Sequence, residues 1–328
     1  MRHIRLDGAL GEGTVADTAM SRSESLDPDS GDGGGRPPAM GPDSPLGRAV
    51  WRLRSRGCWD DAAELLTPYV QQHPQAAIGR AGLLVERCMF TSDGWQAAED
   101  ALRLAEAVAR VDDERGAAAC ERGQLAYAAT VLGVRDRTDE ARAALGRAAA
   151  LLAPNAPGRA LLDFRRGLLA ENLSDTPESA RAAYRRAHAG ATSRGDLLLC
   201  SFTWRHLAGL SVREGELADA RHGFAESLRL REELGFLVGM APALASLADV
   251  EPEPTATRLR EEAARLFRLL GGVPSWLADH LPLPRSPDTR DARHEPNEPD
   301  ESQAPDGGDG RGGPGRPNTG TPRTTATD

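Results

Sequence analysis

The chain has 328 residues and a formal net charge of −9, and all of its 40 basic residues are arginine because it contains no lysine. This excludes a Walker phosphate loop, a Schiff-base enzyme and a Ser-Lys dyad, each of which requires a lysine side chain. Aromatic residues make up only 4% of the chain, alanine and leucine dominate, and β-branched residues are sparse, which favours close-packed helices over sheets.

The beginning of the chain is rich in Gly, Ser, Asp and Pro. Such a composition offers too little apolar surface to offset chain entropy, so we expect residues 1–43 to be a disordered head. The first residues lack the apolar run of a signal peptide, and no segment approaches the length of a membrane span, so a cytoplasmic location is predicted. The absence of any motif in the head leaves Met1, Met20 and Met40 open as start positions.

A series of helical hairpins is expected between residues 44 and 283. In each hairpin a small residue and larger apolar residues recur at helical spacing along the second helix, beginning in chain order at Ala62, Ala98, Ala141, Ala180, Ala220 and Ala263. Steps of 36 to 43 residues between these alanines are typical of repeated helix pairs. Glycine or proline breaks lie where the turns are needed, at Gly57, 91–94, 154–158, Gly195, Gly215 and 251–254.

The fourth and fifth hairpins match each other at an offset of 40 residues. The fifth contains the pattern W-x2-L-[GA]…A-x3-F in the residues Trp204, Leu207, Ala208, Ala220 and Phe224, with Gly215 at the turn. This segment resembles a tetratricopeptide repeat. The resemblance implies an all-α, right-handed α-solenoid of about six helix-turn-helix repeats, in which the first helix of each repeat lines a concave surface.

The end of the predicted solenoid has its own signal. After Gly271, residues 274–281 can form a short amphipathic helix with Trp276 and Leu277 facing inward, which is expected of a C-terminal capping helix. Residues 284–328 are rich in Pro, Gly and Asp and contain no Leu, Val, Ile, Phe, Tyr or Trp, so we expect a disordered tail. The head and the tail carry −4 and −3, which leaves −2 for residues 44–283.

No catalytic or metal-binding arrangement is predicted. Asp60, Asp61 and Glu64 are spaced like the metal-binding acids of terpene cyclases, but acids in a first helical turn are explained by the helix dipole. His206 and His222 have no ligand partner at metal spacing and are interpreted as hydrogen-bonded or exposed. The four cysteines form no C-x-x-C pair and are interpreted as reduced, buried thiols. We therefore predict neither enzymatic activity nor a cofactor.

The predicted binding site is the concave surface formed by the first helices. Arg165 and Arg205 occupy equivalent positions in the fourth and fifth repeats, and the planar guanidinium can bind a carboxylate with two hydrogen bonds. Members of the resembled family that bind acidic C-termini use a comparable basic clamp. The candidate residues are Arg48, Trp51, Arg54, Arg80, Arg87, Arg165, Arg166, Asn172, Arg205, Gly209 and Arg213. The alternative is that these arginines pair with acids on neighbouring turns.

The favoured function is a non-catalytic scaffold that binds a partner peptide or helix in this groove, with an acidic peptide as the candidate ligand. A second interpretation rests on the long repeats and the phrase REELGF, which resemble helical sensor domains of large actinomycete transcriptional activators. Such a stand-alone regulatory domain would lack its own DNA-binding domain. No nucleic-acid or membrane partner is predicted. The oligomeric state stays open, with Trp51 and Trp59 as candidate self-association contacts.

Overall fold

The computed structural model describes residues 44–272, 274 and 277. The described part of the chain is all-α, with twelve α-helices and one short 3-10 helix, η1 (Thr67–Tyr69). In chain order the α-helices are α1 (Pro45–Arg54), α2 (Trp59–Leu66), α3 (Pro74–Thr91), α4 (Trp95–Val108), α5 (Asp112–Val131), α6 (Thr138–Leu151), α7 (Arg159–Asn172), α8 (Pro177–Arg194), α9 (Leu197–Arg213), α10 (Leu217–Glu233), α11 (Leu237–Ala248) and α12 (Thr255–Leu269).

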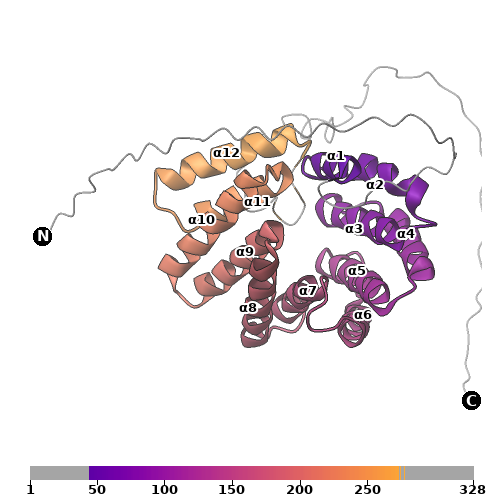
Figure 1. The fold of residues 1–328 in the computed structure, drawn as a ribbon. Coiled ribbons are helices and arrows are strands. Elements are labelled where there is room, and N and C mark those ends of the chain that lie inside the picture. The colour runs from indigo at the N-terminus through magenta and orange to yellow at the C-terminus, as the bar shows by residue number, and fades with distance from the viewer. Residues whose placement is uncertain (1–43, 273, 275–276, 278–328) are drawn as a thin grey trace, which may run out of the picture. The chain divides into compact units, whose positions relative to one another are not determined.

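The helices pack in sequence as six hairpins, from α1–α2 to α11–α12. Each hairpin also contacts the next one, and α5 packs against both α3 and α7. Figure 1 shows the hairpins arranged along an arc, with α3, α5, α7, α9 and α11 on its inner side and their partners on the outer side. The predicted all-α architecture of six stacked helical hairpins is therefore confirmed.

Small residues allow the two helices of a hairpin to approach closely. In α8, Ala180, Tyr184 and Ala187 are all fully buried, as the spacing predicts. Tyr184 packs against the backbone of Gly167 in α7, where an added Cβ would lie 2.4 Å from Cε1 of the ring. Because only glycine fits at this distance, Gly167 fixes how closely α7 and α8 pack.

We expect Gly167→Ala to lower the free energy of unfolding by about 1–3 kcal/mol, because the new methyl group overlaps a ring that has no room to move. The matched control is Gly146→Ala in α6, where an added Cβ meets nothing within 4 Å. That change is expected to stabilise the chain by about 0.5–1 kcal/mol, since alanine favours the helix. Urea unfolding measures both variants, and equal stabilities would contradict the close packing of α7 on α8.

Glycines with positive φ form several of the turns. Gly57, Gly195 and Gly215 have φ values of 80°, 67° and 81°, a region that side chains disfavour. These three turns were predicted from the sequence. The turns at Gly133 and Gly235, which also have positive φ, were not predicted.

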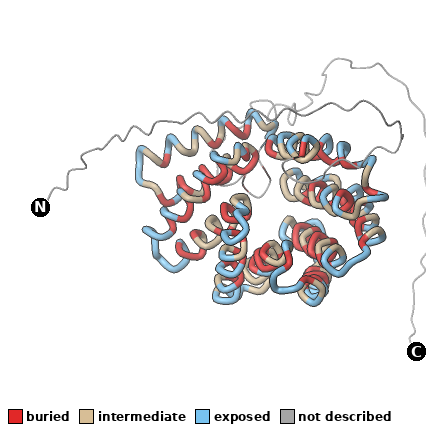
Figure 2. The backbone as a smooth tube through the Cα atoms, in the orientation of Figure 1, coloured by how far each residue is buried: buried red, intermediate tan, exposed pale blue. Residues whose placement is uncertain are grey.

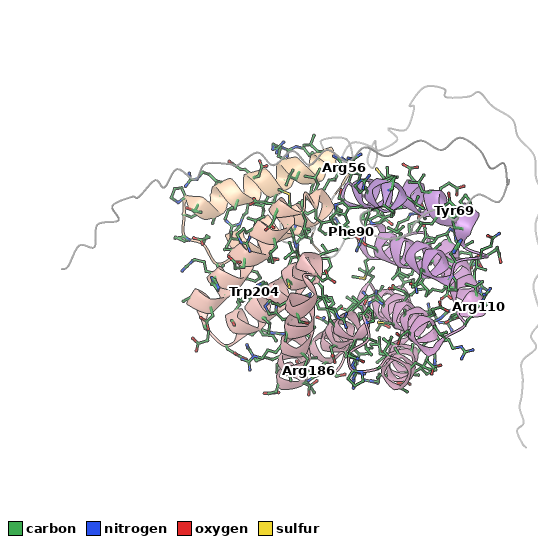
Figure 3. The ribbon with its side chains drawn as sticks, in the orientation of Figure 1. Arg56, Tyr69, Phe90, Arg110, Arg186 and Trp204 are labelled. Carbon is green, nitrogen blue, oxygen red and sulfur yellow. The ribbon has the colours of Figure 1, made fainter. Side chains whose placement is uncertain are left out.

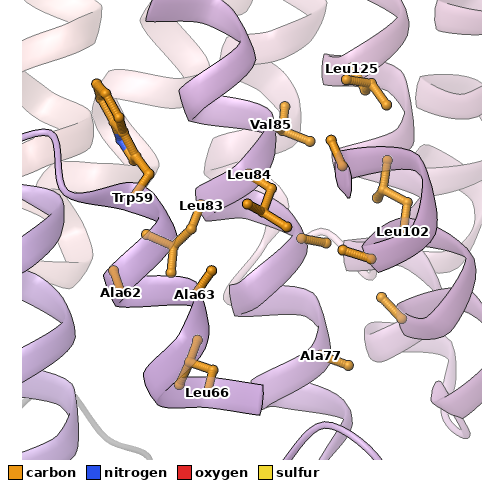
Figure 4. Packing of buried hydrophobic residues seen from close by; sticks show 14 of the residues in the cluster. Trp59, Ala62, Ala63, Leu66, Ala77, Leu83, Leu84, Val85, Leu102 and Leu125 are labelled. Atoms are coloured by element: carbon orange, nitrogen blue, oxygen red, sulfur yellow. The ribbon is translucent and has the colours of Figure 1, made fainter. Parts of the chain in front are cut away.

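The hydrophobic core runs along the whole arc rather than lying at one centre. Figure 2 shows that the helices turn buried residues toward one another and exposed residues outward. The cluster at the N-terminal end is built from α2–α5, with Trp59 and Leu102 among its large side chains (Figure 4). Small alanines such as Ala62 fill the spaces between these side chains. This alternation of large and small residues is how α-helices interdigitate at short distance.

The arc is closed by contacts between the first hairpin and the start of α11. The rings of Trp51 and Phe236 stack with their centroids 5.6 Å apart, and Val238 N donates a hydrogen bond to Ser55 O at 2.9 Å. Trp59, which is 7% exposed, packs on Phe90. Trp51 and Trp59 were predicted as candidate self-association contacts, whereas in the structure both pack against other residues of the chain. We call this contact of α1 and α2 with residues 236–238 the closure.

Most of the predicted cap, 274–281, lies outside the described residues, as do the predicted disordered segments 1–43 and 284–328. Within the cap, Pro274 and Leu277 are described and both are buried. No helix in the described part of the chain is long and apolar enough to cross a membrane.

Candidate peptide-binding surface

The inner surface, meaning the inward-facing side of α1, α3, α5, α7, α9 and α11, contains most of the predicted binding residues. Arg165 of α7 reaches back to α5, where its Nη2 atom lies 2.8 Å from both carboxylate oxygens of Glu121. Each of the two side chains is 10% exposed. Burial alone would lower the pKa of Arg165, but Cys120 and the Glu121 carboxylate more than offset it, so this pKa is raised. Arg165 therefore stays charged and ion-paired.

Arg205 of α9, the predicted equivalent of Arg165, has different surroundings. It is half-buried, and it interacts electrostatically with Glu171 of α7, with Tyr127 of α5 and with Asp249 at the end of α11. Because these groups come from three inner helices, Arg205 faces the inner surface. Burial outweighs their attraction and lowers the pKa of Arg205. Equivalent positions in two repeats thus hold the same residue in unlike environments.

A hydrogen-bonded network joins α7, α8 and α9. Glu171 accepts hydrogen bonds from Tyr184 at 2.6 Å and from Arg213 at 2.6 Å, and lies 2.9 Å from Nδ1 of His206. Burial alone would raise the pKa of Glu171, but the contacts with His206, Tyr184 and Arg213 lower it to about 2. The prediction that His206 is hydrogen-bonded is confirmed. Next to this network, Asn172 donates to the Tyr127 hydroxyl at 2.9 Å.

The first two hairpins are less uniform. Arg54 donates from Nε to Glu86 at 2.7 Å and lies 5.8 Å from the centroid of the Trp51 ring. Arg80 and Arg87 instead contact the preceding hairpin.

Arg80 donates to Thr67 of η1 at 3.2 Å, and Arg87 donates to Asp60 of α2 at 3.0 Å. Their side chains therefore turn toward α2 and η1, and the structure does not bring them together with the other predicted residues. Arg48 and Arg166 are exposed. Gly209 is half-buried, one turn after Arg205, and an added Cβ there would meet nothing within 4 Å.

Three buried polar atoms on consecutive inner helices have no hydrogen-bond partner among the described residues. They are Oε1 of Glu86 in α3, Oε1 of Gln124 in α5 and Nη1 of Arg165 in α7. Sequence reasoning missed Glu86 and Gln124, because a charged or amide residue on a helix is usually a solvated one. Their positions on first helices were the one signal that pointed to them. An unpaired buried polar atom lowers the stability of the folded chain by about 1–3 kcal/mol.

Two clefts lie away from the inner surface. The larger, of about 660 Å³, lies between the start of α4 and the turn from α5 to α6, and its Arg137 is ion-paired with Glu99 and Glu140. The second, of about 500 Å³, lies between α7, α8 and the loop that precedes α7.

Neither the acids nor the thiols of the described residues form a metal site, since no group of three or more His, Cys, Asp or Glu gathers there. All four cysteines are free, and Cys88, Cys120 and Cys200 are buried as predicted, whereas Cys58 was also predicted to be buried and is half-buried. Burial raises the pKa of Cys88 to about 11.

The six stacked hairpins define a helical-repeat protein. No protein-family model and no curated protein matches the sequence. Among solved structures, the chain is similar to the crystal structure of BtubC (BKLC) from P. vanneervenii. The similarity covers 74% of this chain and 96% of that one, with 15% identical residues and a TM-score of 0.45.

Proposed function

We propose that this chain is a non-catalytic scaffold that binds a peptide or a helix of a partner protein on its inner surface. The observation that carries the proposal is the polar lining of the inner surface, where Glu171 of α7 binds Tyr184 and Arg213 and where Asn172 binds Tyr127 of α5. These side chains offer both hydrogen-bond donors and acceptors. A peptide main chain supplies both kinds of group along its length, so it can bind to such a surface.

The ion pairs refine the predicted preference for an acidic ligand. Arg54, Arg165 and Arg213 each already contact a carboxylate of the chain itself. A carboxylate on a ligand would have to compete with Glu121 for Arg165, at a site where breaking the pair is unfavourable. We therefore propose recognition through hydrogen bonds to the main chain of the ligand, with acidic side chains as a secondary contribution.

Site-specific photo-crosslinking tests where the partner binds. We expect a photoreactive residue at Gly209 to crosslink a partner protein in an extract of the cells that express the chain. Position 209 is suitable because it has open space on the inner side of α9. The matched control is the same residue at Gly146 on the outer helix α6, which also has open space. Mass spectrometry of the adducts identifies the partner and its contacting segment.

A synthetic peptide of the crosslinked segment then gives a binding measurement. Arg213→Ala is expected to weaken its binding by about ten-fold, because the Arg213 side chain is 48% exposed on α9 and can donate to the peptide main chain. Crosslinking that is equal at positions 209 and 146, or that occurs only at 146, would place the partner on the outer surface and refute the proposal.

A further inference from the structure

The second cleft lies on a different part of the molecule from the inner surface. Its polar walls are the side chains of Arg159 in α7 and of Arg186 and Arg194 in α8, together with Asp163. Figure 3 labels Arg186, which lies on α8 at the outer edge of the arc. We call this site the arginine cleft.

Two of the three arginines in the cleft donate hydrogen bonds to backbone carbonyls. Arg159 donates to Leu152 O at 3.0 Å, and Arg194 donates to Asn155 O. A carbonyl dipole positions a guanidinium without neutralising its charge. These side chains are therefore oriented and remain cationic.

Asp163 is the carboxylate that lines the cleft, and it forms ion pairs with two of the arginines. Its oxygens are 3.8 Å from Nε of Arg159 and 3.4 Å from Nε of Arg186. Three arginines against one aspartate leave the cleft with a net charge of +2. Arg186 is 56% exposed, so the outer nitrogens of its guanidinium can contact a new partner while Nε keeps its hydrogen bond to the buried Asp163.

The excess of positive charge in the arginine cleft is not a general property of the surface, because the first cleft does not share it. There, three arginines face four carboxylates, which gives −1, and Arg137 is bound by two of them at 2.6 Å. In the arginine cleft, α7 also begins at Arg159 with no acid in its first turn. The positive end of the helix dipole therefore adds to the field of the arginines.

The floor of the cleft is made of small residues, among them Ala160, Ala189 and Gly190. Gly190 lies so close to α7 that an added Cβ would be 3.0 Å from Cβ of Ala160. Small side chains on the floor leave the space between the arginines open, and the cleft has a volume of about 500 Å³. This volume is large enough for a tetrahedral oxyanion and for part of the group that carries it.

We propose that the arginine cleft binds a phosphate group in its dianionic form. Guanidinium groups match phosphate oxygens in pairs of hydrogen bonds, and the charge of the dianion balances that of the cleft. Two sources supply this chemistry, a free phosphate or phosphate ester and a phosphorylated side chain of a protein. The site is independent of the peptide surface proposed above.

Isothermal titration calorimetry on the full chain at low ionic strength tests the site with inorganic phosphate and with N-acetyl-phosphoserine amide. We expect both ligands to bind, and we expect Arg186→Gln combined with Arg194→Gln to weaken binding by about ten-fold or more. The matched control combines Arg147→Gln with Arg185→Gln, which removes the same charge from exposed arginines outside the cleft. It should bind as the wild type does.

A second variant tests the cleft without removing an arginine. Asp163→Asn raises the local charge to +3, so it should bind phosphate several-fold more tightly. Tighter binding of the phosphoserine amide than of phosphate assigns the site to phosphorylated side chains, and equal binding assigns it to free phosphate. Absence of binding by the wild type, or the same loss in both double variants, overturns the proposal.

Discussion

Glu121→Ala is expected to lower the free energy of unfolding by about 3–5 kcal/mol, because it leaves the buried guanidinium of Arg165 without its counter-charge. The two side chains are each 10% exposed, and Nη2 of Arg165 contacts both oxygens of the carboxylate at 2.8 Å. Replacing both partners by apolar residues, as in Glu121→Leu with Arg165→Met, should restore most of the lost stability. Urea unfolding with circular dichroism measures all three proteins.

An exposed pair of the same chemistry provides the control. Arg103 and Asp100 in α4 are 2.5 Å apart but about 60% exposed, so Asp100→Ala should change stability by less than about 1 kcal/mol. If Glu121→Ala were no more destabilising than Asp100→Ala, the ion pair on the inner surface would be accessible to water. Arg165 would then also be available to an acidic ligand, which would favour the basic clamp predicted from the sequence.

Phe236→Ala is expected to destabilise the chain by about 3–5 kcal/mol and to open the closure. The ring stacks on Trp51 at 5.6 Å, meets Phe202 edge-on at 6.1 Å and lies 6.0 Å from the guanidinium of Arg54. Without it, α1 loses its aromatic contact with the far end of the arc. Hydrogen–deuterium exchange should therefore become faster in α1 and α2 before the remaining helices unfold.

Leu162→Ala in α7 separates this local effect from a general loss of stability. Leu162 is fully buried in a cluster of α5, α6 and α7 that contains no residue of α1, α2 or 236–238, so its truncation creates a cavity away from the closure. It should destabilise the chain to a similar extent without selectively increasing exchange in α1. The same exchange pattern in both variants would show that the closure does not hold the first hairpin.

The hairpins could be predicted because their signals are local. Ala180, Tyr184 and Ala187 lie on one face of a single helix, and their small-large-small order is enough to show that another helix packs there. The turn at Gly215 is recognisable for the same reason, since a glycine follows an amphipathic stretch. Each of these inferences needs a window of a few helical turns and nothing more.

The closure could not be predicted in this way. Phe236 ends the phrase REELGF, and its local pattern gives no indication that it stacks on Trp51, which lies in the first hairpin, 185 residues earlier in the chain. A repeat pattern specifies how one hairpin packs on the next, and the curvature accumulates from small rotations at each step. Whether the two ends meet depends on the sum of those rotations, which no single segment contains.

The candidate site was predicted in part. From the helical period we predicted that Arg165, Arg205 and Arg213 lie on first helices. The same pattern indicates ion-pair partners only within a few residues of each arginine. Glu121 lies on the preceding first helix, 44 residues before Arg165, and is brought there by hairpin stacking. Arg80 and Arg87 turn toward α2 and η1 because Thr67 and Asp60 offer them partners, which a pattern on α3 alone does not reveal.

The hydrogen bond between Val238 and Ser55 also bears on how the chain folds. In a linear array each hairpin touches its neighbours alone, so folding can begin anywhere and the end hairpins fray first. A closed arc has no such end on the α1 side, and its fraying is suppressed as long as the distant contact holds. That contact spans most of the described sequence and raises the contact order, so the arc must be largely built before it closes.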